Sequence, residues 1–169
     1  MSGKKAEKTE IVFNSIWKED LETTASLMKK YIQSLKDFPM DTLKSLLSQK
    51  DAIGYIARKG EGGTEIGFII GSMIPTPTIT FVAAIDPKSA REGIGGRLID
   101  EVVEEVKRRN SKATKVIVSL PADMSDGVAL YSSKNFLVQG FVKEVLGSTD
   151  MVHMIKYLKK KKRGLFRRP

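Results

Sequence analysis

Three closely spaced glycines, with two arginines beside them, mark the part of the chain whose residue types could do chemistry. Gly93, Gly95 and Gly96 stand at the expected start of a helix, directly after an expected strand. The first turn of a helix has free backbone N–H groups and a partial positive charge. Glycine has no Cβ, so an anion can approach that backbone, and Arg91 and Arg97 add positive charge. The pattern predicts a pyrophosphate-binding site at this helix start.

Two common classes of phosphate-binding loop are excluded. A P-loop needs Gly-x-x-x-x-Gly-Lys-Ser/Thr, which the chain lacks. A dinucleotide-binding fold needs Gly-x-Gly-x-x-Gly early in an all-parallel sheet. Here the spacing is Gly93-x-Gly95-Gly96, and the preceding strands are expected to be antiparallel. The phosphate ligand therefore belongs to another class.

Hydrophobic periodicity indicates the strands and helices that must position this segment. Short turns rich in Gly or Pro separate three β-rich runs before it, which is typical of an antiparallel meander. The best helix is Gly93 to Arg109, with Glu104–Arg108 and Glu105–Arg109 pairs on its expected exposed side. We expect strands at 10–16, 51–58, 64–74, 78–86, 115–120, 140–146 and 151–158, and helices at 20–37, 41–49, 93–109 and 125–134.

The order of these elements predicts the fold class. Residues 78–120 form a strand, a crossover helix and a strand, and such a crossover makes the two strands parallel. We therefore expect a single-domain α/β (α+β) fold with a mixed, mostly antiparallel sheet, a central β-α-β crossover and helices on both faces. Residues 1–9 are expected to be a flexible N-terminus, 10–158 the folded domain, and 159–169 a basic flexible tail.

Composition narrows the chemistry and the surroundings. The chain has no cysteine and one histidine, which excludes a disulfide framework, a thiolate nucleophile and a multi-histidine metal site. It has no apolar run of about 18–20 residues and no secretory signal, so we expect a cytoplasmic protein. Seven basic residues of the tail account for most of the net charge of +9. A solvated tail is the favoured interpretation, with weak contact of Lys159–Arg168 to nucleic acid or an acidic partner left open.

The glycine segment resembles the GNAT superfamily of N-acetyltransferases. Their cofactor motif, Gln/Arg-x-x-Gly-x-Gly/Ala after a strand, is matched by Ala90-Arg91-Glu92-Gly93-Ile94-Gly95, and the element order agrees over residues 10–158. The resemblance implies acetyl-CoA as co-substrate. It also implies that the backbone of Ala83, Ala84 and Ile85 pairs with the pantetheine arm. The pyrophosphate would contact the segment Arg91, Glu92, Gly93, Ile94, Gly95, Gly96 and Arg97.

A second motif of that superfamily, Leu-Tyr-x-x-x-Gly-Phe, is similar to Leu130-Tyr131-Ser132-Ser133-Lys134-Asn135-Phe136. Asn135 replaces the glycine and tolerates the left-handed conformation that a helix C-cap requires. The resemblance implies that Tyr131 lies near the CoA sulfur and protonates the leaving thiolate, so Tyr131 is the candidate catalytic residue.

Three positions depart from the pattern of the superfamily. Ala90 replaces a phosphate-contacting Gln or Arg, Met124 replaces an Asn that contacts pantetheine, and Ser119 stands where some members have a Glu base. Removing the amine proton requires some acceptor. The candidates are Glu65, Asp123, Glu144 and His153; each is more simply a surface or strand residue, and none is assigned.

These observations predict an N-acetyltransferase that moves an acetyl group from acetyl-CoA to a primary amine by direct attack. No covalent enzyme intermediate is expected, because no Ser-His or Cys-His pair is visible in the sequence. The alternatives are a non-catalytic acyl-CoA-binding regulator or interaction domain, and a nucleic-acid-associated protein that uses the basic tail. The acceptor could be a protein or a small molecule, the chain a monomer or a homodimer, and no metal is expected.

Overall fold

The computed structural model describes residues 10–32, 37, 39–84, 90, 92–146 and 149–158. The flexible N-terminus predicted for 1–9 and the basic tail predicted for 159–169 lie outside these ranges. Two predicted site residues, Ile85 and Arg91, also lie outside them.

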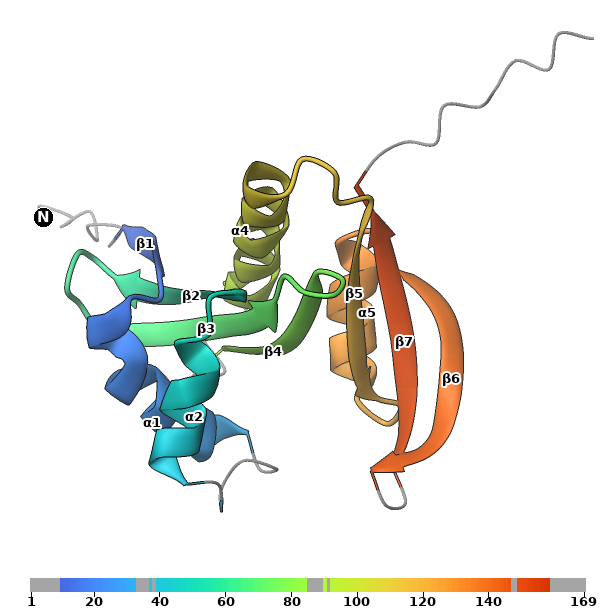
Figure 1. Cartoon of the computed structure of the whole chain (residues 1–169), viewed down its shortest axis with the longest axis horizontal. Coiled ribbons are helices and arrows are strands. Elements are labelled where there is room, and N and C mark those ends of the chain that lie inside the picture. The colour runs from blue at the N-terminus through green and yellow to red at the C-terminus, as the bar shows by residue number, and fades with distance from the viewer. Residues whose placement is uncertain are drawn as a thin grey trace, which may run out of the picture.

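The described residues form the predicted α/β domain (Figure 1). In chain order the elements are β1 (Ile11–Ser15), the 3₁₀ turn η1 (Lys18–Asp20), α1 (Leu21–Tyr31), α2 (Met40–Leu47), β2 (Ala52–Lys59), β3 (Glu65–Ser72), β4 (Thr78–Ala84), α4 (Ile94–Arg109), β5 (Lys115–Pro121), α5 (Ser125–Ser133), β6 (Leu137–Leu146) and β7 (Thr149–Tyr157). None of these helices is both long and apolar enough to cross a membrane.

Two boundaries differ from the sequence prediction by more than two residues. Helix α1 ends at Tyr31 and not at Asp37, because Ile32 already has an extended backbone with φ −114° and ψ 100°. Aromatic and β-branched residues have a weaker helix propensity, and here two of them are consecutive. Strand β6 begins at Leu137 and not at Gly140, because Gly140 lies at a register shift inside the strand. Glycine inside a strand often marks such a bulge.

Within the described residues, seven strands form one mixed sheet in the order β1-β2-β3-β4-β5-β7-β6. Strands β1 to β4 pair antiparallel, and so do β5 with β7 and β7 with β6. Only β4 and β5 pair in parallel, across the α4 crossover. The predicted mixed sheet with a central crossover is therefore confirmed.

Helices cover both faces of the sheet, as predicted. The apolar stripe of α4 packs on one face against β2, β3 and β5 in the main core, together with Tyr131 of α5. Helices α1 and α2 pack on the other face, against Ile56, Phe68 and Ile70. Successive residues of a strand point to opposite faces, so Phe68 and Ile69 of β3 enter different cores. Burial on both faces explains why β3 is apolar along most of its length.

Strands β4 and β5 diverge soon after they start. Their parallel pairing consists of Thr78 with Ile117 and Ile79 with Val118. Directly after this, Thr80 of β4 has no opposite residue on β3, because Gly71 pairs with Ile79 and Ile70 pairs with Phe81. A bulge of this kind bends the strand and increases its twist. Figure 1 shows β4 curving away from β5, so the two strands open a wedge in the middle of the sheet.

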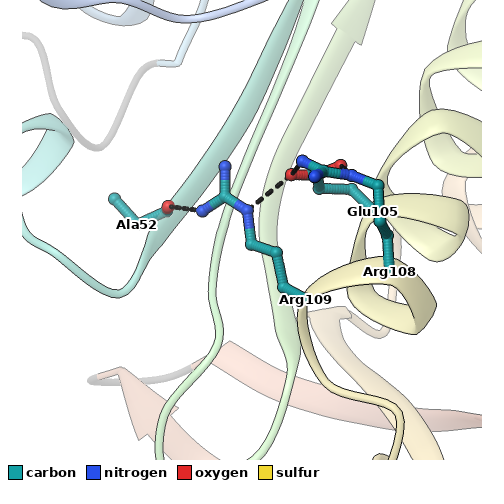
Figure 2. Close-up of polar contacts among 4 residues, drawn as sticks. All are labelled: Ala52, Glu105, Arg108 and Arg109. Atoms are coloured by element: carbon teal, nitrogen blue, oxygen red, sulfur yellow. Dashed lines mark hydrogen bonds and ion pairs between the residues drawn. The ribbon is translucent and has the colours of Figure 1, made fainter.

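The C-terminal end of α4 is fixed to β2 by a buried carboxylate. The Glu105 side chain is 4% exposed, and Arg108 donates to its Oε2 at 2.7 Å. Arg109 also contacts Glu105 and donates a second hydrogen bond, of 3.2 Å, to the carbonyl of Ala52 (Figure 2). The expected exposed position of Glu105 is therefore wrong, since the helix turns this residue toward β2. The expected Glu104–Arg108 pair is also wrong: Glu104 pairs with Lys107.

Gly71 provides a test of the close contact between β3 and β4. A Cβ at this position would lie 2.3 Å from the carbonyl oxygen of Thr78, a backbone atom that has no free rotation. We expect Gly71→Ala to lower the free energy of unfolding by about 2 kcal/mol or more, measured by urea denaturation. Gly140→Ala is the matched control, because a Cβ there meets nothing within 4 Å. Equal stability of the two variants would contradict this account of the β3–β4 contact.

Glu105 provides a pH-dependent test. Hydrogen bonding from Arg108 lowers the pKa of the Glu105 carboxyl below its usual value, against the opposing effect of burial. The carboxylate therefore stabilises the fold at neutral pH, and this contribution is lost as the pH falls through its folded-state pKa. We expect Glu105→Gln to cost about 1 kcal/mol at pH 7 in urea denaturation and progressively less in acid. Glu104→Gln, at an exposed pair, is the control; a difference for Glu105→Gln that does not change with pH would contradict the prediction.

Candidate functional site

The N-terminus of α4 presents a set of free backbone donors. The N–H of Gly93 donates to Ala90 at 3.1 Å, and the first helical hydrogen bond runs from Arg97 to the carbonyl of Gly93, also at 3.1 Å. Between them, the N–H groups of Ile94, Gly95 and Gly96 have no acceptor among the described residues. The helix has no side-chain cap and no acidic residue in its first turn. Three donors and the positive end of the helix dipole therefore form a site suited to an anion.

The three glycines of this turn differ in what a side chain at each position would meet. Gly93 has a left-handed backbone, with φ 74° and ψ 22°, and a Cβ there would meet nothing within 4 Å. Gly95 and Gly96 are buried against α5: their Cβ atoms would lie 3.1 Å from Leu130 and 2.7 Å from Lys134. Glycine at position 95 thus allows Leu130 of α5 to pack closely on α4, Gly96 lies against the flexible end of the Lys134 side chain, and the helix end is left open at Gly93.

Three other residues of this turn were predicted to contact a ligand, namely Ile94, Glu92 and Arg97. Ile94 is fully buried in the main core, so its backbone alone is available to a ligand. Glu92 is exposed and directly precedes Gly93. The Arg97 guanidinium lies 4.4 Å from the centre of the Phe13 ring, a cation–π contact that directs it toward β1 and away from α5. Arg97 therefore contributes its charge from the side of the helix that faces β1.

Lys134 is a residue of this region that the sequence did not single out. It follows the C-terminal end of α5 and forms an ion pair with Asp100 of α4. Its Nζ lies 3.3 Å from the position that a Cβ of Gly96 would occupy. A second cation is thus held against the first turn of α4, beside Gly96. The sequence signal that could have identified Lys134 is a basic residue at the end of the helix that follows the crossover.

The wedge between β4 and β5 leaves one edge of β4 without a strand partner. Ala83 and Ala84 pair with β3 through Phe68 and Gly67, while β5 has already diverged. The first turn of α4 lies beside this edge, because a Cβ on Gly95 would reach Val82 of β4 at 4.0 Å. The anion site and the free strand edge are therefore adjacent, a geometry that fits an extended ligand with a phosphate group.

Tyr131 lies on α5 in the main core and is 3% exposed. Its ring meets Phe136 edge-on, with 5.1 Å between centroids. Burial raises the pKa of the Tyr131 phenol, so the hydroxyl keeps its proton at neutral pH. The turn that follows has Asn135 at φ 62°. The left-handed conformation expected of Asn135 is thus confirmed, and the Tyr131–Phe136 contact survives without the glycine.

Ser119 and His153 form a hydrogen-bonded pair that the sequence analysis missed. The Ser119 Oγ lies 2.8 Å from His153 Nδ1, across the paired strands β5 and β7. The sequence analysis found no activated Ser-His pair, and the structure shows that these two residues are hydrogen-bonded. These residues are 34 positions apart, and only the register of two strands that are neighbours in the sheet brings them together.

The other residues considered as proton acceptors are less suited to this role. Glu65 is paired with Arg58 at 3.5 Å, and Asp123 is exposed on the surface. The Glu144 side chain lies outside the described part of the structure. No group of three His, Cys, Asp or Glu residues that could hold a metal ion occurs among the described residues.

Comparisons with known proteins agree with this geometry. No protein-family model matches the chain, and no curated protein matches its sequence. Among solved structures, it is similar to the ribosomal-protein-S18-alanine N-acetyltransferase from Escherichia coli, with a TM-score of 0.71 and 18% identity over 93% of this chain and 99% of that one. It is also similar to the spermidine/spermine N-acetyltransferase SpeG from Vibrio cholerae, with a TM-score of 0.66 and 15% identity over 88% and 95%.

A third similar structure is the NatC complex bound to Gag peptide and CoA, with a TM-score of 0.71 and 20% identity over 89% of this chain and 99% of that one. At such identities the similarity establishes the fold. The chain therefore has the fold of GNAT N-acetyltransferases, as the resemblance of its two motifs implied.

Proposed function

We propose that the chain is an N-acetyltransferase that moves an acetyl group from acetyl-CoA to a primary amine by direct attack. One observation carries the proposal: the N–H groups of Ile94, Gly95 and Gly96, which have no acceptor among the described residues, lie beside the edge of β4 from which β5 has diverged. A ligand that joins a pyrophosphate to an amide-containing arm matches both features, since the donors suit the phosphates and the strand edge suits the amides. Two of the similar solved structures are N-acetyltransferases, and a third, the NatC complex, was bound to CoA.

In this proposal the residues of the chain bind, orient and stabilise. The N–H groups of Ile94, Gly95 and Gly96 hold the pyrophosphate, and the backbone of Ala83 and Ala84 pairs with the pantetheine arm. Lys134 and Arg97 add positive charge near the α4 turn. These two cations take over from the phosphate-contacting side chain that Ala90 lacks.

Tyr131 acts on the leaving group. The amine attacks the thioester carbonyl, so that a C–N bond forms and the C–S bond breaks. Because burial raises the pKa of Tyr131, its proton is held more tightly than that of a thiol with an ordinary pKa of about 8.5. We therefore propose that Tyr131 stabilises the thiolate as a hydrogen-bond donor, and that the sulfur takes its proton from solvent.

The proposal also includes the cellular location, the acceptor, the partner of the basic tail and the oligomeric state. The absence of cysteine is consistent with a cytoplasmic protein. Contact of Lys159–Arg168 with nucleic acid or an acidic partner would rest on charge alone, and the acceptor would be a protein or a small-molecule amine. The chain would act as a monomer or a homodimer.

Substitution of Gly93 tests the phosphate site by charge. The position has room for a side chain, and Asp and Asn are the residues that best tolerate its left-handed backbone. We expect Gly93→Asp to weaken acetyl-CoA binding at least about tenfold relative to Gly93→Asn in titration calorimetry, because a carboxylate would cap the free donors and repel the phosphates. The two variants have the same shape, so equal affinities would contradict the proposed site, and no binding by the wild-type chain would contradict the proposed function.

Substitution of Tyr131 tests its role in the reaction. We expect Tyr131→Phe to lower kcat by about 10–100-fold, which corresponds to the loss of one hydrogen bond to a developing charge, with acetyl-CoA affinity unchanged. The assay measures release of free thiol with the best acceptor from a panel of peptides and polyamines. Tyr157→Phe, at a side chain that is 59% exposed, is the control. A Tyr131→Phe variant with the wild-type kcat would exclude the phenol from the reaction.

A further inference from the structure

The proposed reaction lacks an acceptor for the proton of the attacking amine. An amine nitrogen becomes positively charged as it attacks a carbonyl, and it must lose a proton to give an amide. Of the carboxylates that the sequence offered, Glu65 is ion-paired and Asp123 lies on the surface. Ser119 alone is a poor base and His153 alone is an ordinary strand residue, but the structure joins them.

We infer that Ser119 and His153 form a proton relay, in which Ser119 takes the proton of the amine and passes its own to His153. The inference rests on the proposed acetyl transfer and adds the group that completes it. It is carried by three features of the described residues: the place of Ser119 in the wedge, the direction of the pair, and the surroundings of the imidazole.

Ser119 is the first residue of β5 beyond the divergence from β4. The last parallel pair is Ile79 with Val118, so Ser119 stands where the wedge begins to open. In the proposed site the arm of acetyl-CoA lies along the unpaired edge of β4 in this same wedge. A side chain at the start of the wedge is therefore well placed to contact an amine that attacks there.

The pair faces away from the helices that form the anion site. Val118 and Leu120 point into the main core with α4 and α5, so Ser119, between them, points to the opposite face. Helices α1 and α2 pack on that face against β2 and β3. An amine can thus approach Ser119 from one face of the sheet while the anion site lies at the α4 end on the other. Two substrates in one wedge need two separate approaches of this kind.

The surroundings of His153 favour a hydroxyl–imidazole pair. The neighbouring positions on its face are apolar, namely Ile117 and Pro121 on β5 and Met151 and Ile155 on β7. A hydrogen bond is stronger in such an environment than in water. On the other side, His153 pairs with Gly140 of β6, where a Cβ would meet nothing within 4 Å. The imidazole therefore has open space beside it, through which it can return its proton to solvent.

With this relay, each proton and each bond of the proposed reaction is accounted for. As the C–N bond forms, the amine proton passes to Ser119 Oγ and the serine proton passes to His153 Nδ1, while the C–S bond breaks. His153 then releases its proton to solvent, and the thiolate takes one from solvent. The products are the amide and free CoA, and Ser119 and His153 return to their starting states. Ser119 is the catalytic residue of this pair, and His153 acts through it.

The lone histidine allows a direct spectroscopic test. The relay requires Ser119 to donate to Nδ1, which leaves the proton of the neutral imidazole on Nε2. Two-bond ¹H–¹⁵N NMR of the full chain at a pH where the imidazole is neutral distinguishes the two tautomers, and His153 is the one histidine in the sequence. We expect the Nε2–H tautomer in the wild type and a loss of this preference in Ser119→Ala. An Nδ1–H tautomer in the wild type would overturn the relay, whether or not the protein transfers acetyl groups.

Kinetics provide the second test. His153→Asn places an amide near the position of Nδ1, so a hydrogen bond to Ser119 can be kept, but the amide cannot accept a proton. We expect Ser119→Ala and His153→Asn each to lower kcat by about 100-fold, the double variant to be no worse than either, and acetyl-CoA affinity to stay unchanged. Ile155→Val, two residues from His153 on the same face, is the control for packing.

The outcomes separate the two proposals. A His153→Asn variant with the wild-type kcat, in a protein that transfers acetyl groups, would overturn the relay alone. A wild-type protein that binds acetyl-CoA but acetylates none of a panel of peptides and polyamines would overturn the proposed acetyl transfer and the relay with it.

Discussion

The early divergence of β4 and β5 is the constraint on which the rest of the site depends. Two residue pairs hold the strands together, and the unpaired Thr80 then bends β4 away. A parallel sheet that continued further would satisfy the backbone groups of β4 and bury Ser119 between neighbouring strands. Because the pairing stops, no strand of the described part of the chain pairs with this edge of β4 after Ile79. Backbone groups near a core cost free energy unless a partner, water or a ligand pairs with them, so the proposed function uses this edge to bind the arm of acetyl-CoA.

Helix α4 converts this wedge into an oriented site. A Cβ on Gly95 in its first turn would lie 3.1 Å from Leu130 of α5 and 4.0 Å from Val82 of β4, so this glycine sets how closely α5 approaches. At its other end, Arg109 joins Glu105 to the carbonyl of Ala52. A helix fixed at both ends holds its free N–H groups in place before any ligand arrives. Donors that need no rearrangement are the most effective in stabilising charge.

The fold could be predicted from the sequence because the hydrophobic periodicity of its helices and strands is strong and depends only on residues close together in the chain. The stripe of α4 and the apolar run of β5 predicted the crossover, and the left-handed Asn135 followed from residue chemistry. Contacts that depend on strand register could not be predicted from the sequence. The Ser119–His153 pair joins residues 34 positions apart, and the burial of Glu105 depends on which side of α4 faces β2. Sequence reasoning predicted an anion site and attributed all three glycines to ligand approach, whereas the close contact of Gly95 with Leu130 depends on how α5 packs on α4.

The chain lacks several side chains of the superfamily pattern, but other residues that lie nearby in the structure can take over their roles. In the proposed function, phosphate binding at α4 would depend mainly on backbone N–H groups, which no side-chain change removes, so Ala90 would cost one contact at most. Lys134, paired with Asp100, and Arg97, over the Phe13 ring, place two cations near the same turn. A carboxylate base on β5 would combine contact with the amine and proton affinity in one side chain. Ser119 keeps the contact, and His153, on the next strand of the sheet, supplies the proton affinity. The absence of a Glu at position 119 therefore does not argue against catalysis, because His153 on β7 can take the proton that the Glu would have accepted.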